Sequence, residues 1–292
     1  MQWSVHISGV DDLSSEALSR FAAAESIARY AGDVRFSHCC FGTEFCEHLL
    51  PAPATVQAIA NAARGRGLGF TLLTPYVTDG GIRRLRELFD VLPDNGEVVF
   101  NDWGTLGVLN REFPQLRPIQ GRLLNKSLRD PRVMGIYGAT SESETLTALR
   151  GSNLDCESYT AFLTRFGVAA VELDNLPQGA DLSFAARGME VAVYLPYGFI
   201  STSRVCMAAG LHYRKPDKFQ PGAVCRHECQ THLLEYTYTS SPFNNRDQKF
   251  YLKGNTYFYM HSPEMLERLF EQVRSGLVSR LVLQPRLPMV WS

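Results

Sequence analysis

Cysteines are the residues of this sequence best suited to chemistry. Seven are present, at positions 39, 40, 46, 156, 206, 225 and 229. An odd number cannot all pair as disulfides, and disulfides are rare in a reducing compartment. The cysteines of a reduced protein bind metal, take part in catalysis or pack as small hydrophobic residues. Their positions along the chain favour metal binding for some of them.

Two cysteines form a short pair in a polar loop. Cys225 and Cys229 are separated by three residues, whereas a buried structural cysteine normally lies within an apolar run. Cys206 closes a predicted strand and turn. Three thiolates that met would repel one another, so they would need a soft metal. The candidates are an iron–sulfur cluster, or zinc with His227 or His232 as a further ligand.

A fourth sulfur ligand could come from a group of cysteines near the amino terminus. Cys39 and Cys40 are adjacent, so in an extended chain their side chains point in opposite directions and at most one could face a cluster. Cys46 lies in the loop that follows the second predicted strand. The residues alone leave this choice open.

Short apolar runs alternate with amphipathic stretches along most of the chain. We predict eight strands, over 3–7, 34–37, 70–74, 97–100, 116–121, 169–173, 189–195 and 280–284. We predict helices over 14–30, 54–63, 82–89, 105–111, 158–166 and 265–274. This order indicates a parallel α/β sheet, and about eight strand–helix units in 292 residues favour a closed (β/α)8 TIM-barrel-like domain.

One segment breaks the alternation. Residues 210–250 are polar, rich in turns and aromatic, and they include two of the cysteines. We predict a single domain over 1–292, with residues 206–250 as a cluster-binding insertion at the barrel mouth. Functional residues of such barrels lie at the carboxyl ends of the strands, where the loops that carry Cys46 and Cys206 begin.

The composition excludes some classes of protein. The formal net charge is −1, without the basic excess that coating nucleic acid or a membrane surface requires. No run approaches the roughly 20 apolar residues of a membrane span. The first residues lack the basic start of a secretory signal, so we expect a cytoplasmic protein. The near-neutral net charge disfavours nucleic acid as a partner.

Several segments of the sequence match a known family. They are 3–5, Gly-Thr-Glu-Phe-Cys at 42–46, Asp-Trp-Gly-Thr-Leu-Gly-Val at 102–108, 121–125, 171–173, 189–198, 203–206, 225–229 and 280–285. Together they resemble the collagenase-like peptidase family of unknown mechanism (U32), and within it the short UbiU/UbiV-like branch, UbiV-like proteins most of all. The resemblance extends over nearly the whole chain. The chain departs from the branch in a longer loop between Cys206 and Cys225 and over 233–250.

The resemblance implies a cofactor and its ligands. In UbiV-like proteins four cysteines hold a 4Fe-4S cluster, which implies Cys46, Cys206, Cys225 and Cys229 as ligands here. Cys46 is favoured over its two upstream neighbours because it keeps the distance to the third predicted strand unchanged. Cys156 also has a counterpart in the branch, which is not a ligand, and we expect it to pack in the core.

The resemblance also implies an activity. Such proteins belong to oxygen-independent hydroxylation systems that act on an aromatic or quinone-precursor substrate, as in ubiquinone biosynthesis, with prephenate as oxygen donor. Asp102 and Glu172 lie at predicted strand ends, where carboxylates of such barrels are often functional, so we expect catalytic roles for both. We expect Trp103, Tyr197 and Arg204 to bind the ring and carboxylate of a substrate. Proteolysis has less support, because the sequence contains neither Gly-x-Ser-x-Gly nor His-Glu-x-x-His.

Each of these residues also has a purely structural interpretation. Trp103 and Tyr197 could pack against the barrel, Arg204 could be a solvated loop charge, and Asp102 could cap the following helix. Alternative functions are also open: a non-catalytic iron–sulfur partner in a heterodimer with a related U-type protein, hydroxylation of an RNA base, or a peptidase-like activity. The near-neutral charge disfavours the RNA alternative.

Overall fold

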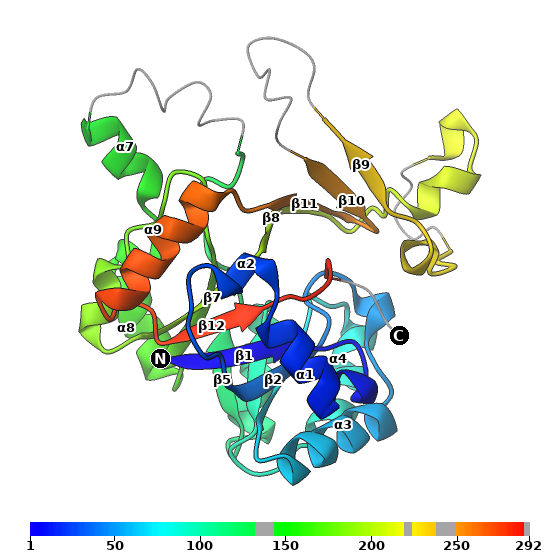
Figure 1. Ribbon diagram of the computed structural model, residues 1–292. Coiled ribbons are helices and arrows are strands. Elements are labelled where there is room, and N and C mark those ends of the chain that lie inside the picture. The colour runs from blue at the N-terminus through cyan, green and yellow to red at the C-terminus, as the bar shows by residue number, and fades with distance from the viewer. Residues whose placement is uncertain (132–142, 219–223, 238–248, 289–292) are drawn as a thin grey trace.

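Eight parallel strands form a closed barrel in the computed structural model, which describes residues 1–131, 143–218, 224–237 and 249–288 (Figure 1). The strands follow one another in chain order around the ring, and the last one pairs with the first. The predicted TIM-barrel-like fold is confirmed. The barrel strands are β1 (Gln2–His6), β2 (Phe36–Gly42), β3 (Gly69–Leu73), β4 (Glu97–Phe100), β5 (Arg117–Gln120), β6 (Ala170–Asp174), β7 (Glu190–Leu195) and β12 (Arg280–Leu283).

Helices pack around the outside of this ring, and several begin at a side-chain cap. The hydroxyls of Ser14, Thr78 and Ser262 each accept a hydrogen bond from a backbone N–H in the first turn. The described helices are α1 (Ser15–Ala22), α2 (Glu25–Ala28), α3 (Pro53–Gly65), α4 (Asp79–Phe89), α5 (Trp103–Glu112), α7 (Ser143–Arg150), α8 (Glu157–Arg165) and α9 (Pro263–Arg274).

Two predicted elements differ from the observed ones. The helix predicted over 14–30 is interrupted near Ala23, which ends α1 as its cap residue. The sequence predicts the second strand over 34–37, but β2 runs over Phe36–Gly42. The last four residues of β2 are buried. Two adjacent cysteines among them interrupt the apolar run from which a strand would be predicted.

A second, antiparallel sheet lies across the carboxyl end of the barrel, above the barrel strands in Figure 1. Its strands, in spatial order, are β8 (Tyr197–Thr202), β11 (Thr256–Met260), β10 (Phe250–Lys253) and β9 (Leu234–Tyr236). The predicted insertion over 206–250 lies within this region. Because β8 and β11 also belong to the sheet, the segment that departs from the barrel pattern is wider than 206–250.

Side chains fill the barrel interior. The middle of the barrel holds a small apolar cluster made of Cys40, Leu73, Val99, Ile119, Ala170, Ala192, Tyr194 and Val282. A much larger apolar core lies between the strands and the surrounding helices. The interior is therefore packed rather than open, as in other barrels of this size.

The amino-terminal end of the barrel is closed by a buried ion pair. Both terminal nitrogens of Arg280 donate to the Glu97 carboxylate, at 2.6 and 3.0 Å. The Thr71 hydroxyl donates to the same carboxylate at 2.6 Å. Burial opposes the ionisation of Glu97, but the hydrogen bonds from Arg280 outweigh it and lower the pKa of this carboxyl group.

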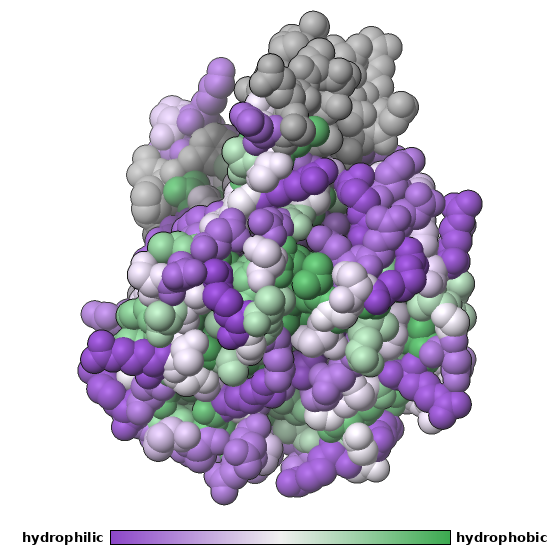
Figure 2. Space-filling model, turned by 90° about the vertical axis from the view of Figure 1, so that its left-hand side faces the viewer, coloured by the Kyte–Doolittle hydropathy of each residue, from purple (hydrophilic) through white to green (hydrophobic). Residues whose placement is uncertain are grey.

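The outer surface is mainly polar on the face that Figure 2 shows, where hydrophobic residues form small groups among hydrophilic ones. In the described part of the chain, no helix has the length and apolar character needed to cross a bilayer.

The Glu97 pair generates a stability prediction. Arg280→Met should lower the free energy of unfolding by about 3 kcal/mol at neutral pH, because a buried carboxylate loses its two-bond partner and keeps only Arg117, at 3.1 Å. Since the folded-state pKa of Glu97 is lowered, this stabilisation is present above its unfolded pKa and is lost as the pH falls. Urea unfolding at several pH values measures both effects. Arg35→Met is the control, because its pair with Asp33 is exposed; equal effects of the two substitutions would contradict the prediction.

Candidate metal centre

The four cysteines named as ligands come from loops at the carboxyl end of the barrel. Cys46 follows β2 and immediately precedes the turn η2 (Glu47–Leu49). Cys206 follows β8, and Cys229 lies in the turn η7 (Glu228–Gln230), with Cys225 in the loop before it. Cys229 is buried and the other three are half-buried.

These thiols lie within electrostatic reach of one another. Burial, and then the charges of Cys225, Cys229 and Cys206, raise the pKa of Cys46 to about 12. The pKa values of Cys206 and Cys229 are also raised, first by burial and then by neighbouring thiol charges. Such a group retains several negative charges only beside a cation, and sulfur donors prefer a soft one. The donor set therefore fits a thiolate-bound metal or cluster.

The sulfurs do not already form a coordination sphere. Within the described ranges, no three His, Cys, Asp or Glu side chains are arranged as ligands of one metal ion. His232, a candidate fourth ligand for zinc, is exposed, and its Nδ1 lies 3.1 Å from the carbonyl oxygen of Glu228 in its own loop.

Several N–H groups point at these sulfurs. The Ala209 amide donates to Cys206 Sγ at 3.5 Å, and the Gln230 side chain donates to Cys229 Sγ at 3.4 Å. A backbone hydrogen bond from His48 to Cys46 lowers the pKa of that thiol, against the larger effect of burial. N–H groups directed at sulfur stabilise thiolate charge and tune the potential of iron–sulfur clusters.

The loop between Cys225 and Cys229 is shaped by its own residues. His227 adopts a left-handed conformation with φ of 58°, which reverses the chain between the two cysteines. The buried Glu228 carboxylate accepts from the Arg226 amide at 3.2 Å. The short pair is therefore held in a compact turn.

An apolar group surrounds two of the sulfurs. Cys46 and Cys229 pack with Phe45, Leu49, Phe199, Phe258 and Leu287. Tyr197, expected to bind substrate, packs against the same group, and its ring meets that of Tyr251 edge-on at 6.5 Å. This surrounding would partly shield a bound cluster from water, which lowers the local dielectric and shifts the potential.

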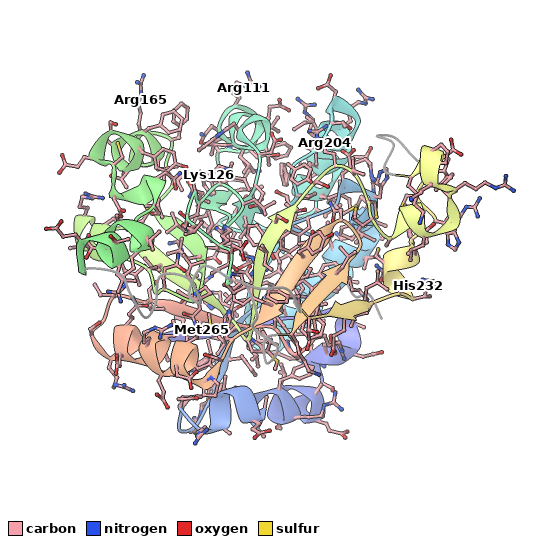
Figure 3. The ribbon with its side chains drawn as sticks, turned by 90° about the horizontal axis from the view of Figure 1, so that it is seen from above. Arg111, Lys126, Arg165, Arg204, His232 and Met265 are labelled. Carbon is pink, nitrogen blue, oxygen red and sulfur yellow. The ribbon has the colours of Figure 1, made fainter. Side chains whose placement is uncertain are left out.

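A cavity of about 290 Å³ opens beside Cys46. The Arg204 guanidinium, expected to bind substrate, lies over the Tyr76 ring, 5.6 Å from its centroid. Figure 3 places Arg204 beyond the end of β8 and Met265 at the opposite end of the sheet. The cavity is lined by Phe45, Cys46, Glu47, His48, Tyr76, Thr78, Arg204 and Asn255.

A larger cavity, of about 420 Å³, lies at the other end of the barrel beside His38 and Glu97. Active sites of this fold form at the carboxyl ends of the strands, so the smaller cavity is the better candidate for a substrate site. The carboxylate of Glu47 in its wall already accepts two hydrogen bonds from Thr78, at 2.7 and 3.0 Å.

Below the cysteine loops, one arginine ties several strand ends together. Arg122 is fully buried and donates to both oxygens of Glu44, at 2.8 and 2.7 Å, and to Asp174 at 2.8 Å. Arg129 pairs with the other oxygen of Asp174. The Arg122 guanidinium also lies over the ring of Tyr194, 3.9 Å from its centroid. Glu44, two residues before Cys46, is thereby fixed.

Glu172, expected to be catalytic, lies deeper than its predicted place at a strand end. It is the third of five residues in β6, and its carboxylate accepts a hydrogen bond from the Tyr194 hydroxyl at 2.8 Å. Burial, and then the charge of Glu44, raise the pKa of Glu172 to about 8. The side chain can therefore hold a proton near neutral pH inside the barrel.

The other two candidates make local structural contacts. Asp102 caps α5: its Oδ1 accepts from the amides of Gly104 and Thr105, at 2.7 and 3.2 Å. Trp103 is 43% exposed and meets Phe162 of α8 edge-on, with ring centroids 5.6 Å apart. These contacts support the structural interpretation of both residues.

The three remaining cysteines are separate from this group. Cys39 faces the outer core, whereas Cys40 points into the barrel, where its Sγ lies 3.0 Å from the Ser4 hydroxyl. Their opposite orientations agree with the expectation for adjacent residues of a strand. Cys156 was expected to pack in the core, but it is exposed at the start of α8, with its sulfur 3.1 Å from Ser158 Oγ.

Three residues near the sulfurs are not among those predicted from the sequence. Tyr76 lies beside Cys46, and Lys253 interacts electrostatically with Cys229. Asn255 contacts the loops of both Cys46 and Cys206. The sequence does contain a signal for the turn that carries Lys253 and Asn255. Gly254-Asn255 between two runs that alternate apolar and polar residues is typical of a β-hairpin.

Comparisons with known proteins give structural likenesses at low sequence identity. No protein-family model and no curated protein sequence matches the chain. Among solved structures, the U32 peptidase Mk0906 aligns over 99% of this chain and 94% of its own, with 12% identity and a TM-score of 0.45. The spore cortex-lytic enzyme SleL of Bacillus megaterium aligns over 97% and 70%, with 9% identity and a TM-score of 0.37. The glycoside hydrolase family 18 N-acetylglucosaminidase from Paenibacillus barengoltzii aligns over 97% and 94%, with 9% identity and a TM-score of 0.35. These likenesses extend no further than general architecture.

Glu172 generates a pH prediction. Its carboxyl group is protonated in the folded protein up to about pH 8 but ionises near its ordinary value when unfolded, so unfolding releases a proton between these values. Stability should therefore fall as the pH rises through this window, by on the order of 1 kcal/mol per pH unit. Glu172→Gln removes the titration and keeps an acceptor for Tyr194. Urea unfolding of both proteins between pH 5 and 8 should give a steeper decline for the wild type; parallel curves would contradict the assignment.

Proposed function

We propose that this chain binds a 4Fe-4S cluster through Cys46, Cys206, Cys225 and Cys229 and serves an oxygen-independent hydroxylation system. The observation that carries the proposal is the electrostatic interaction of these four thiols, which come from three loops, with Cys46 in the wall of a cavity. A set of four sulfur donors suits an iron–sulfur cluster. When bound, the cluster would supply electron transfer or a site for ligating substrate. The UbiV-like resemblance of the sequence points to the same cofactor.

The cavity supports a small aromatic or quinone-precursor substrate. A volume of about 290 Å³ is at the lower end of the range for small-molecule sites and is too small for a folded polypeptide. The Tyr76 ring offers a stacking surface, and the Arg204 guanidinium can pair with a carboxylate, such as those of prephenate, the implied oxygen donor. The Tyr197 side chain packs against the apolar group that surrounds Cys46 and Cys229.

Glu172 is the acid that we assign to this system. Its raised pKa lets it hold a proton at neutral pH, and the Tyr194 hydroxyl fixes its orientation. Asp102 takes a positioning role, since its carboxylate holds the start of α5 and its Oδ2 also accepts from the Val77 amide at 3.4 Å, beside Tyr76.

A second candidate function is that of an iron–sulfur subunit that works only beside a related U-type protein. Exposed apolar side chains on the cysteine-bearing segment favour it: Val224 is 68% exposed and Leu233 is 49% exposed. Apolar side chains exposed together often mark an interface with another protein. A heterodimer found on co-purification would support this alternative.

The first test concerns the cluster. Protein purified without oxygen should be brown and contain about four irons and four labile sulfides per chain. Replacing any of the four ligands by alanine should strip or degrade the cluster, because one iron is then open to exchange. Iron and sulfide assays with the visible absorption spectrum measure this.

The other cysteines provide the controls. Cys39→Ala and Cys156→Ala should keep the full iron content. Stoichiometric zinc without labile sulfide would overturn the iron–sulfur assignment. Cluster loss in Cys40→Ala with retention in Cys46→Ala would show that the first ligand is wrongly chosen.

The second test concerns activity. Deleting the gene should cause an under-hydroxylated aromatic compound to accumulate in anaerobic cells but not in aerated ones. A gene that encodes Glu172→Gln should fail to correct the defect, although the purified variant keeps its iron. Mass spectrometry of quinone precursors and of RNA nucleosides separates the substrate classes. An unchanged profile, together with cleavage of peptides by the purified protein, would contradict the hydroxylation proposal and favour a peptidase.

A further inference from the structure

The turn between β10 and β11 inserts a single amide among the loops of the candidate metal centre. Asn255 is 6% exposed, and its Nδ2 lies 2.6 Å from the carbonyl oxygen of Ser203 and 2.8 Å from that of Phe45. The Tyr76 hydroxyl lies 3.1 Å from the same nitrogen. One side chain thus joins three loops that are distant in the sequence.

Two of these loops carry proposed sulfur ligands. Phe45 is the residue directly before Cys46, so a bond to its carbonyl fixes the backbone from which that sulfur projects. The Cys206 loop is held on both sides: the Ser203 amide donates to the Asn255 carbonyl at 3.3 Å, and the Ala208 amide donates to the Gly254 carbonyl at 3.2 Å.

The chemistry of the position requires an amide. The two carbonyl oxygens can only accept, so the residue between them must donate, and an Asn side chain supplies two N–H bonds on one atom. Its Oδ1 is already used, since it accepts from the Thr256 hydroxyl at 3.0 Å. An aspartate would place a carboxylate oxygen against two carbonyl oxygens. Gly254, with φ of 61°, lets the chain turn tightly enough to bring the amide there.

The same turn reaches a third ligand. Lys253, adjacent to Gly254, is buried and interacts electrostatically with the Cys229 thiol. The β10–β11 turn, residues 253–255, therefore contacts the surroundings of three of the four proposed ligands.

We propose that Asn255 is a positioning residue that sets the spacing between the Cys46 and Cys206 sulfurs for a shared cluster. The inference rests on the proposed iron–sulfur function. Asn255 does not touch the cluster itself. It acts through the backbone of the two loops, in the manner of the outer hydrogen bonds that orient metal ligands elsewhere.

The test compares Asn255→Asp and Asn255→Ala with a matched control. Asn175 is equally buried, and its Nδ2 donates to a carbonyl, that of Met265, at 3.0 Å, at the opposite end of the extra sheet. Asn175→Asp should cost stability but keep the wild-type cluster. The three variants and the wild type are purified without oxygen, and their unfolding midpoints are recorded.

Each protein is then challenged with an iron chelator, and its reduced form is examined by electron paramagnetic resonance. We expect both Asn255 variants to lose iron about 10-fold to 100-fold faster than the wild type, the range for outer partners of metal ligands. We also expect a changed spectrum in whatever cluster remains, an effect that lower stability alone does not produce. The alanine variant gives the answer if the aspartate variant does not fold.

The outcomes separate the two proposals. Wild-type chelation rates and spectra in the Asn255 variants would overturn the positioning role and leave the iron–sulfur function standing. Equal cluster loss in Asn175→Asp would show a general stability effect and would also overturn it. A wild-type protein without iron and sulfide would overturn the iron–sulfur function and the positioning role with it.

Discussion

The buried guanidinium of Arg122 is the interaction on which the rest of the barrel mouth depends. A fully buried positive charge is tolerated only with paired carboxylates, and Glu44 and Asp174 supply them from the ends of two other strands. Burial opposes the charge, but these carboxylates outweigh it and raise the pKa of Arg122. The backbone of Phe199 reaches the same group, since its amide lies 3.4 Å from Asp174. Four segments are therefore joined by one network of charged and hydrogen-bonding groups. This network fixes the start of the loops above it.

Above this network, the rigid barrel and the irregular loops have different roles. The barrel contributes a packed interior, with Glu172 and Tyr194 as an enclosed polar pair. The loops contribute sulfur, and three of the four proposed ligands come from the segment between β7 and α9. The loops are held to the barrel by buried hydrogen bonds, such as those of Arg122 and Asn255, and by the apolar group around Cys46 and Cys229.

Sequence patterns predicted the ring of strands but not what lies across it. Most barrel strands are predicted from the sequence because buried parallel strands are continuous apolar runs. The second prediction, over 34–37, overlaps β2 only at Phe36 and Ser37. The strands of the second sheet were missed, since their aromatic and polar residues alternate over short lengths and pair only with one another. The helix-capping alternative for Asp102 was foreseeable from local chemistry. The role of Asn255 was not, because its partners stand 210 and 52 residues away in the chain.

The order of the strands along the chain determines when the barrel can close during synthesis. β12 enters the ring between β1 and β7, so the barrel cannot close until its eighth strand has been synthesised. By then every cysteine has already been made. Pairing the first strand with the last is a contact of long sequence separation, which slows folding. During that interval the thiols are exposed to oxidants. Insertion of the cluster that we propose would therefore be a late event, in competition with oxidation of the thiols.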